Sequence, residues 1–380
     1  MNKNIRYIVL SDIHFGNPRN RSVTIEEHLD HFFKVNRKIL TSLDIIFLAG
    51  DIFDGVLNGD SIDYTIAITW LSKLAFFCKK HGIKLRILEG TASHDAKQCA
   101  AFIKVLDNLE LSLDYKYIDK LFIEYMTDLD FTILYVPDEV NADASKTLEE
   151  VKIMYADKGI DKVDIAIMHG SFNYRYRGLE LKSTHDEHEY LKLVSRFISI
   201  GHEHTKSIYE RIIGQGSFDR LAHGEEEDKG CVYIKLDKDS KDLDEYVFMV
   251  NTESTIFKTI LVKTSDTEEF TTLLKDALSN IPIGSHISFK LDKGNHVVKS
   301  IPDIVKQHPG YRFTTTIVDE TAKETSLSTA LGDDTCQEVL HIHKDNISQL
   351  VTDELSLRDY SETLIRIAKS ELLAVLNECA

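Results

Sequence analysis

The chain has 380 residues, of which 43% are hydrophobic, and its formal net charge is −17 at pH 7. That length and composition are sufficient for two or three domains with hydrophobic cores. A surface of that sign repels nucleic acid and membranes, so any phosphate binding must be local or metal-assisted.

Other features of the composition indicate a cytoplasmic protein. The five cysteines are scattered and form no C-x-x-C pair, which is typical of a reducing compartment. The apolar run at residues 5–10 is too short for a signal peptide, and no apolar run reaches the length of about 18 residues that a membrane span needs. We therefore expect no membrane partner.

Apolar runs that end in polar turns alternate with segments of helical periodicity along the first 250 residues, which predicts an α/β fold. We predict strands at residues 5–10, 44–49, 83–89, 121–125, 131–136, 163–168, 197–200, 207–213, 231–236 and 246–250. We predict helices at residues 24–40, 62–81, 96–106 and 144–158.

The pattern changes near residue 251. Residues 251–320 predict a small α/β unit, and the polar, turn-rich residues 321–337 predict a linker. Residues 338–380 read as helical, with an apolar stripe near the C-terminus. Because this stripe follows a linker, it favours docking on a partner over packing on the body.

Aspartate and histidine residues follow five of the predicted strands directly. They are Asp12, His14, Asp51, His94, His169, His202 and His204. In an α/β fold such strand ends share one edge of a sheet, so these side chains should converge. Mixed imidazole and carboxylate ligands suit Mn, Fe, Zn or Co. Asp51, which follows a buried strand and Gly50, is the candidate that bridges two cations.

Two metal ions held close together clamp phosphate oxygens and activate a water for attack on phosphorus. A nearby acid must then protonate the leaving oxygen, and His94 is the candidate. Asp95 is positioned in the sequence to hydrogen-bond the other ring nitrogen of His94 and to hold that ring oriented and charged.

The order Asp-x-His, Gly-Asp, a Gly-Asn-His-Asp-like segment, His-Gly and Gly-His-x-His resembles the calcineurin-like metallophosphoesterases. Within them the chain is similar to SbcD-type DNA repair nucleases, including their phage counterparts. Residues 50–54 and the segment from Gly216 to Gly230 carry that similarity. It implies a two-sheet sandwich flanked by helices at residues 1–250, a cap at 251–320 and a C-terminal helical arm at 338–380.

The resemblance also implies a ligand set. Metal 1 would be held by four of the residues above, namely Asp12, His14, Asp51 and His204. Metal 2 would be held by Asp51, His169 and His202, with Ser93 at the place of the family's asparagine. We expect Mn²⁺ at both sites, with Mg²⁺, Fe²⁺ and Zn²⁺ as alternatives. Ser93 has a second interpretation, as the cap of the helix that starts near residue 96.

Two smaller patterns have competing interpretations. Arg175, Arg177 and Lys182 are either a DNA-facing patch or a solvated surface. The run His185-Asp186-Glu187-His188 resembles a metal motif, but an acidic first turn of a helix capped by Ser183 or Thr184 explains it better.

The function that these features predict is a dinuclear-metal DNA exonuclease and endonuclease in DNA repair, recombination or end processing. The resemblance implies an SMC-like coiled-coil ATPase as partner, and a homodimer is an open alternative. The rival functions are a metallophosphoesterase acting on a phosphoprotein or small phosphoester, and a DNA-end-binding scaffold with a weakened metal site.

Overall fold

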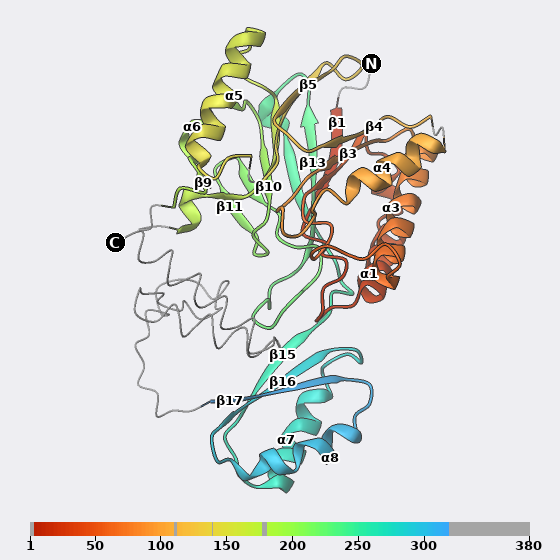
Figure 1. The fold of residues 1–380 in the computed structure, drawn as a ribbon, viewed down its shortest axis with the longest axis vertical. Helices are drawn as coiled ribbons and strands as arrows, with labels where there is room; N and C mark the ends of the chain where they lie inside the picture. Colours follow the sequence, from red (N-terminus) through yellow and green to blue (C-terminus); the bar gives the residue numbers. More distant parts are fainter. Residues whose placement is uncertain (1–3, 110–111, 139, 177–180, 319–380) are drawn as a thin grey trace, which may run out of the picture. The chain divides into compact units, whose positions relative to one another are not determined.

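The computed structural model describes residues 4–109, 112–138, 140–176 and 181–318. The predicted linker and the predicted C-terminal arm lie outside these residues. Within them no helix is both long and apolar enough to cross a membrane. The fold is of the mixed α/β class, as predicted (Figure 1).

The first six-stranded sheet has the strand order β14-β13-β1-β2-β3-β4. Its members are β1 (Asn4–Leu10), β2 (Ile45–Ala49), β3 (Lys84–Leu88), β4 (Tyr115–Ile118), β13 (Gly230–Asp237) and β14 (Glu245–Val250). Strands β1 to β4 are parallel, and β13 and β14 continue the sheet in antiparallel fashion. The four parallel strands therefore end at the same edge.

The second six-stranded sheet has the order β11-β12-β10-β7-β6-β5. Its members are β5 (Phe122–Met126), β6 (Phe131–Val136), β7 (Ile165–His169), β10 (Ile198–Gly201), β11 (Ser207–Tyr209) and β12 (Ile212–Gly214). Strands β6, β7, β10 and β12 are parallel. This sheet also has four parallel strands ending at one edge.

The two sheets share a core, and helices cover their outer faces. Alternate residues of both sheets, such as Phe47 and Tyr135, form the inner core. On the first sheet's outer face lie α1 (Ser22–Val35), α3 (Ile62–His81) and α4 (Cys99–Asn108). On the second lie α5 (Ala144–Lys158) and α6 (Glu187–Leu193). The order helices, sheet, sheet, helices is visible in Figure 1.

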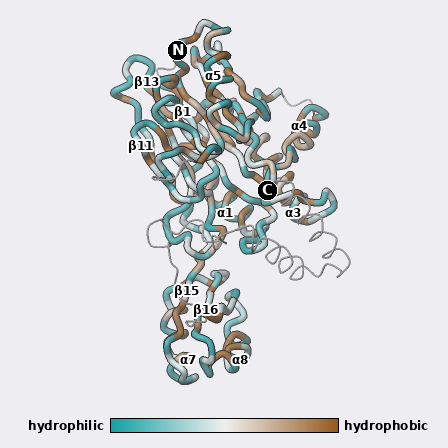
Figure 2. Tube along the Cα trace, turned by 60° about the vertical axis from the view of Figure 1, so that its left-hand side comes forward, coloured by the Kyte–Doolittle hydropathy of each residue, from teal (hydrophilic) through white to brown (hydrophobic). Residues whose placement is uncertain are grey.

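A third sheet follows, built from β15 (Phe257–Val262), β16 (His286–Asp292) and β17 (Arg312–Val318), all parallel. Helices α7 (Thr267–Leu278) and α8 (Ile301–Lys306) pack on it around a separate core that includes Phe270 and Phe289. Hydrophobic stretches of β15, β16 and α8 are visible in Figure 2.

Several predicted elements differ in detail from the observed ones. The predicted helix 24–40 is broken at Asn36 into α1 and α2 (Arg37–Leu40). Helix α4 begins at Cys99 and not near residue 96, because Ala96 and Lys97 adopt positive φ angles. The predicted strand 207–213 is two strands, β11 and β12, which turn at Glu210. Strand β4 and the short pair β8 (Ser171–Phe172) and β9 (Thr184–His185) were not predicted.

One buried ion pair joins the two large sheets. Arg86 of β3 donates from Nε and Nη2 to the carboxylate of Glu124 of β5, at 2.9 and 3.0 Å. Lys116 and Tyr135 also donate to Glu124. Arg86 also pairs with Asp114, at 2.8 Å, but the Arg86–Glu124 pair is the contact in which both charges are buried, so losing either partner leaves the other poorly compensated for its lost hydration.

Arg86→Met should therefore lower the free energy of unfolding by about 3–5 kcal/mol, since it leaves Glu124 buried without its main partner. Urea denaturation followed by circular dichroism measures this loss. Lys192→Met is the matched control, because Lys192 pairs with Glu189 at the surface and should change stability by at most about 1 kcal/mol. Equal effects in the two variants would contradict the assigned role of the buried pair.

Candidate metal centre

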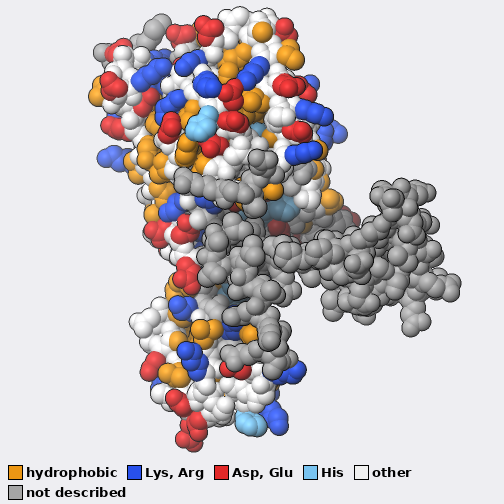
Figure 3. All heavy atoms as spheres, turned by 90° about the vertical axis from the view of Figure 1, so that its left-hand side faces the viewer, with side chains coloured by type: hydrophobic (Ala, Val, Ile, Leu, Met, Phe, Trp, Pro, Cys, Tyr) orange, Lys and Arg blue, Asp and Glu red, His pale blue; other side chains and the backbone are white. Residues whose placement is uncertain are grey.

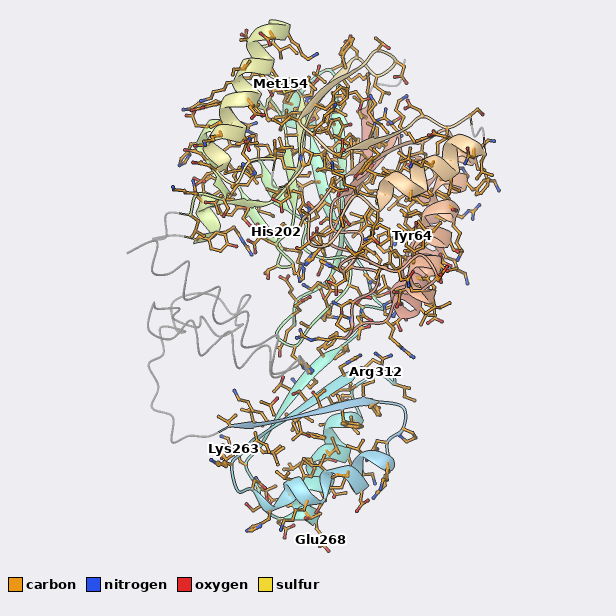
Figure 4. The ribbon with its side chains drawn as sticks, in the orientation of Figure 1. Tyr64, Met154, His202, Lys263, Glu268 and Arg312 are labelled. Carbon is orange, nitrogen blue, oxygen red and sulfur yellow. The ribbon has the colours of Figure 1, made fainter. Side chains whose placement is uncertain are left out.

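The residues that follow the parallel strands of both large sheets come together in one cluster. Side-chain donor atoms form three groups within 4.8 Å: Asp12, His14 and His204; His14, Asp51 and His94; and Asp51, His169 and His202. Asp12 and His14 follow β1, Asp51 follows β2 and His94 follows β3. His169 ends β7, and His202 and His204 follow β10. Figure 4 labels His202, which lies between the two helical layers.

The backbone at the cluster is unusual. Asp12, His14, Asp51 and His202 all have positive φ angles, between 52° and 104°. Non-glycine residues adopt such angles at a cost, and they concentrate at functional sites. Backbone hydrogen bonds hold the loop after β1 to the loop after β2: the amides of Ile13 and His14 both donate to the carbonyl of Asp51.

Gly50 and Gly90 allow the loops to approach each other closely. A Cβ on Gly50 would lie 2.2 Å from His169 Nδ1, and its φ is +86°. A Cβ on Gly90 would lie 2.2 Å from the backbone nitrogen of Asp51. No side chain fits at either position, so the glycines bring the ligand-bearing turns of neighbouring strands together.

In the first group, two histidine nitrogens face each other. His14 Nδ1 lies 2.9 Å from Asp54 Oδ1, and His204 Nδ1 lies 3.1 Å from Glu225 Oε1. With each Nδ1 donating its hydrogen to a carboxylate, the neutral rings direct the lone pairs of Nε2 inward. The two Nε2 atoms are 3.2 Å apart. Two lone pairs at this distance repel unless a proton on one ring or a metal ion compensates them.

The group of Asp51, His169 and His202 also has a ring whose Nδ1 is bonded outside the cluster. His169 Nδ1 donates to the Ala49 carbonyl at 2.7 Å, so Nε2 faces Asp51 Oδ2, 3.3 Å away. Burial lowers the pKa of His169, but the Asp51 carboxylate outweighs it and holds that pKa well above its usual range. Positive charge at this nitrogen is therefore favoured, and a metal ion supplies it without a proton.

Asp51 belongs both to the group with His14 and His94 and to the group with His169 and His202. Its Oδ2 lies 3.3 Å from His169 Nε2, 3.9 Å from His14 Nε2 and 3.0 Å from His94 Nδ1. Burial raises the pKa of Asp51, but His169, His94 and His14 together hold it far below its usual range. Asp51 is thus a buried carboxylate between two sets of nitrogen ligands, as the bridging prediction requires. The mixed imidazole and carboxylate donors are of the kind that borderline divalent cations prefer.

The side chain of His94 is 36% exposed, like those of His202 (37%) and His204 (32%), whereas His14 and His169 are buried. Its ring lies edge-on to His14, with centroids 4.8 Å apart. The hydrogen bond to Asp51 raises the pKa of His94. Partial exposure, together with the contact to Asp51, suits His94 to exchange a proton with a bound substrate.

The predicted role of Asp95 is wrong. Its two oxygens accept hydrogen bonds from four backbone amides, those of Asp51, Ile52, Phe53 and Gly90, at 2.7 to 3.0 Å. Asp51, and not Asp95, contacts the ring nitrogen of His94. Burial and the charge of Asp51 raise the pKa of Asp95 to about 7, while the bonds from Phe53 and Gly90 lower it. Asp95 fastens the Asp51 turn to the Gly90 turn.

The structure does not bring Ser93 into the cluster. Ser93 is exposed, and α4 starts six residues later with Gln98 as its N-cap, so neither predicted role of Ser93 is observed. Thr91, and not Ser93, lies beside the group of Asp51, His169 and His202. Its Oγ1 lies 3.2 Å from Asp51 Oδ2, 3.2 Å from His202 Nδ1 and 3.5 Å from His169 Nε2.

Asp138 is the further acidic residue at this place. Its Oδ2 lies 3.1 Å from Thr91 Oγ1 and 4.0 Å from His202 Nδ1. Thr91 directly follows Gly90, and Asp138 comes two residues after β6. The rule that predicted the other candidates, a polar residue just after a strand, also fits Thr91 and Asp138. Neither residue was predicted from the sequence.

The three basic candidates do not form an observed patch. Arg175 is partly buried and lies 3.8 Å from Glu203, which also accepts a hydrogen bond from Tyr176. Lys182 is exposed, and Arg177 lies outside the described residues. Figure 3 shows Lys and Arg side chains interspersed with Asp and Glu on one face of the molecule. The interpretation of this region as a DNA surface stays a prediction.

No protein-family model and no curated protein sequence matches this chain. Among solved structures it is similar to GAP50, the anchor in the inner membrane complex of Plasmodium, at 13% identity and a TM-score of 0.40, over 66% of this chain and 86% of that one. A second crystal structure matches at 12% identity and a TM-score of 0.39, over 65% of this chain and 99% of the other. Likenesses this weak carry no argument about function.

Asp51→Asn should weaken both metal groups at once, because it removes the one negative charge that they share. We expect less than half of the Mn²⁺ bound by the unmodified protein, as measured by equilibrium dialysis and elemental analysis. Asp60→Asn, at an exposed position nearby, is the matched control and should leave the metal content unchanged. Full metal content in Asp51→Asn would contradict the bridging role.

Asp95→Asn should lower the free energy of unfolding by about 2–3 kcal/mol, since an amide nitrogen would face backbone N–H donors in a buried position. Chemical denaturation measures this change. Because Asp95 is not a ligand, a folded variant saturated with Mn²⁺ should still bind close to the unmodified amount. Unchanged stability would show that the four hydrogen bonds do not hold the turns.

Proposed function

We propose that this chain is a metal-dependent phosphodiesterase that hydrolyses DNA. One observation carries the proposal: two groups of inward-facing histidine and aspartate atoms share the single carboxylate of Asp51. Two adjacent cations with a shared carboxylate are the arrangement that phosphoester hydrolysis uses. The four layers of the body agree with the metallophosphoesterase sandwich that the sequence motifs imply, and we take that fold as part of the proposal.

Residues of the loops after β1, β2 and β10, together with His169 at the end of β7, would hold the cations. His14, His169 and His204 each offer one Nε2 lone pair, and Asp51 would be shared. When bound, two divalent cations polarise a phosphate and lower the pKa of a water molecule. Asp54, Glu225 and the Ala49 carbonyl keep the three rings in the tautomer that this ligation needs.

Hydrolysis adds a water oxygen to phosphorus and breaks the bond between phosphorus and the leaving oxygen, which then needs a proton. His94 suits this step, because it reaches the cluster through Asp51 yet remains partly exposed. A charged His94 donates its proton to the leaving oxygen, and the neutral ring regains one from solvent.

DNA is the substrate class that the sequence similarity favours, and nothing in the geometry of the cluster itself selects it over other phosphoesters. The net charge of −17 means that DNA would be bound locally, through metals and the partly buried Arg175. We include in the proposal the SMC-like ATPase partner, which rests on the same similarity. Its proposed docking arm, residues 338–380, lies outside the described residues.

A nuclease assay in Mn²⁺ tests the proposal. The full chain is incubated with linear duplex, single-stranded oligonucleotide, p-nitrophenyl phosphate and a phosphopeptide, with and without chelator. Cleavage of DNA that chelator and Asp51→Asn abolish supports the proposal. Hydrolysis of the small phosphoester or the phosphopeptide alone would favour the rival phosphatase, and metal-loaded protein that binds DNA ends without cleaving them would favour the scaffold.

His94→Ala should reduce turnover of DNA by about 10²–10⁴-fold, the usual contribution of general acid catalysis, while metal content stays near its unmodified value. Single-turnover rates at saturating Mn²⁺ measure this. His296→Ala, an exposed histidine of the third sheet's unit, should cleave like the unmodified protein. A near-normal rate for His94→Ala on a DNA phosphodiester would assign the proton to another donor.

A further inference from the structure

A cavity of about 490 Å³ lies beside the metal cluster and is linked to it through Asp138. Asp138 belongs to both: its Oδ2 lies 3.1 Å from Thr91 Oγ1, and the residue lines the cavity. The volume is within the range of small-ligand sites, roughly 300–1,000 Å³. A substrate with its phosphate at the cluster therefore has room for an attached group here.

His185 lines this cavity and is buried, with 6% of its surface exposed. Its Nδ1 has no hydrogen-bond partner among the described residues. Burial lowers the pKa of His185 to about 4, so the ring is neutral and has one donor and one acceptor nitrogen. Because Nδ1 is enclosed by the protein, Nε2 is the ring nitrogen of His185 that a ligand in the cavity can reach.

Gly170 joins the cavity to the cluster. It follows the ligand His169 directly, and a Cβ at Gly170 would lie 3.3 Å from both His185 Nε2 and Asp138 Oδ1. The φ of Gly170 is +132°. A side chain here would be crowded by His185 and Asp138 and strained by the backbone angle, so a glycine at this position lets the segment after His169 pass close to both.

The lining indicates what kind of group fits. None of the described lining residues is lysine or arginine, and Asp138 is acidic, so a second phosphate is disfavoured. Apolar surface from Pro137 and Val140 lies beside polar groups. Asn141 uses its Nδ2 on Thr147 and Glu150, which leaves its carbonyl oxygen as an acceptor. The lining suits a neutral, flat group with a hydrogen-bonding edge.

We propose that this cavity receives the base of the nucleotide whose phosphate lies at the metal cluster, with His185, Asp138 and Asn141 contacting the polar edge of that base. The inference rests on the proposed function and deepens it: the substrate is a nucleotide taken out of the base stack, at a strand end or in a single strand. Extrusion of a base costs least at such places. The cavity thus adds selection for an unpaired nucleotide to the metal chemistry.

The test compares cleavage of an oligonucleotide with that of the same strand carrying one abasic site, at the 5′ or the 3′ end, in Mn²⁺. The unmodified protein should favour the intact strand in kcat/KM by about tenfold or more, the equivalent of one or two neutral hydrogen bonds. His185→Phe keeps the ring that packs against Phe172 and Tyr190 but removes both nitrogens. It should reduce that preference to less than about threefold.

His188→Phe is the matched control, because His188 is exposed on α6 and does not line the cavity; its preference should equal that of the unmodified protein. Ala142→Phe, at an exposed lining position, fills the cavity without disturbing the core and should also lose the preference. If His185→Phe does not fold, Ala142→Phe tests the inference in its place. Equal rates on intact and abasic strands, or an undiminished preference in either variant, overturn the inference alone. Unmodified protein that cleaves neither strand overturns the proposed function and this inference with it.

Discussion

The arrangement of the site depends on one carboxylate. Asp51 is buried where the carboxyl ends of the parallel strands of the two large sheets meet. Nitrogen atoms from His14, His94 and His169 all approach its Oδ2 atom. A charge in such a position needs compensation, and so do the histidine lone pairs around it. Divalent cations meet both needs at once. The positive φ angles around Asp51 place these groups in spite of their backbone cost.

The groups around the cluster matter as much as its ligands. Asp95 uses its oxygens on four backbone amides and so fixes the turn that presents Asp51. Glu225 orients His204 and is itself held by the fully buried Lys229, 3.0 Å away. Loss of either acid would alter the ligands without touching them, because ring orientation and turn position are set from outside the cluster.

The sequence predicted the strands and most of the convergence, because a buried parallel strand ending in a polar residue places that residue at the sheet edge. The carboxyl-end rule holds for Asp12, Asp51, His169 and His202. This rule could not predict which side chains of the following turns contact the cluster. Ser93 and Asp95 were placed by motif, yet three consecutive residues of a turn point in different directions. Which of them faces the cluster depends on the backbone angles of the turn, and no periodicity encodes those angles. The positive φ angles of Ala96 and Lys97, which delay the start of α4, are equally hidden in the sequence.

The same limit explains why the cavity beside the cluster was not predicted. The run that contains His185 was interpreted as the acidic start of a helix, and α6 does begin there, but its N-cap is Asp186 and not Ser183 or Thr184. That interpretation accounts for Asp186 and Glu187 but not for His185, which pairs through β9 with the short strand after His169. Such a pairing between segments 13 residues apart depends on where the chain returns in space. A buried histidine that lines a cavity and lacks a partner is thus a property of the folded chain, and it becomes interpretable only after the metal cluster has been located beside it.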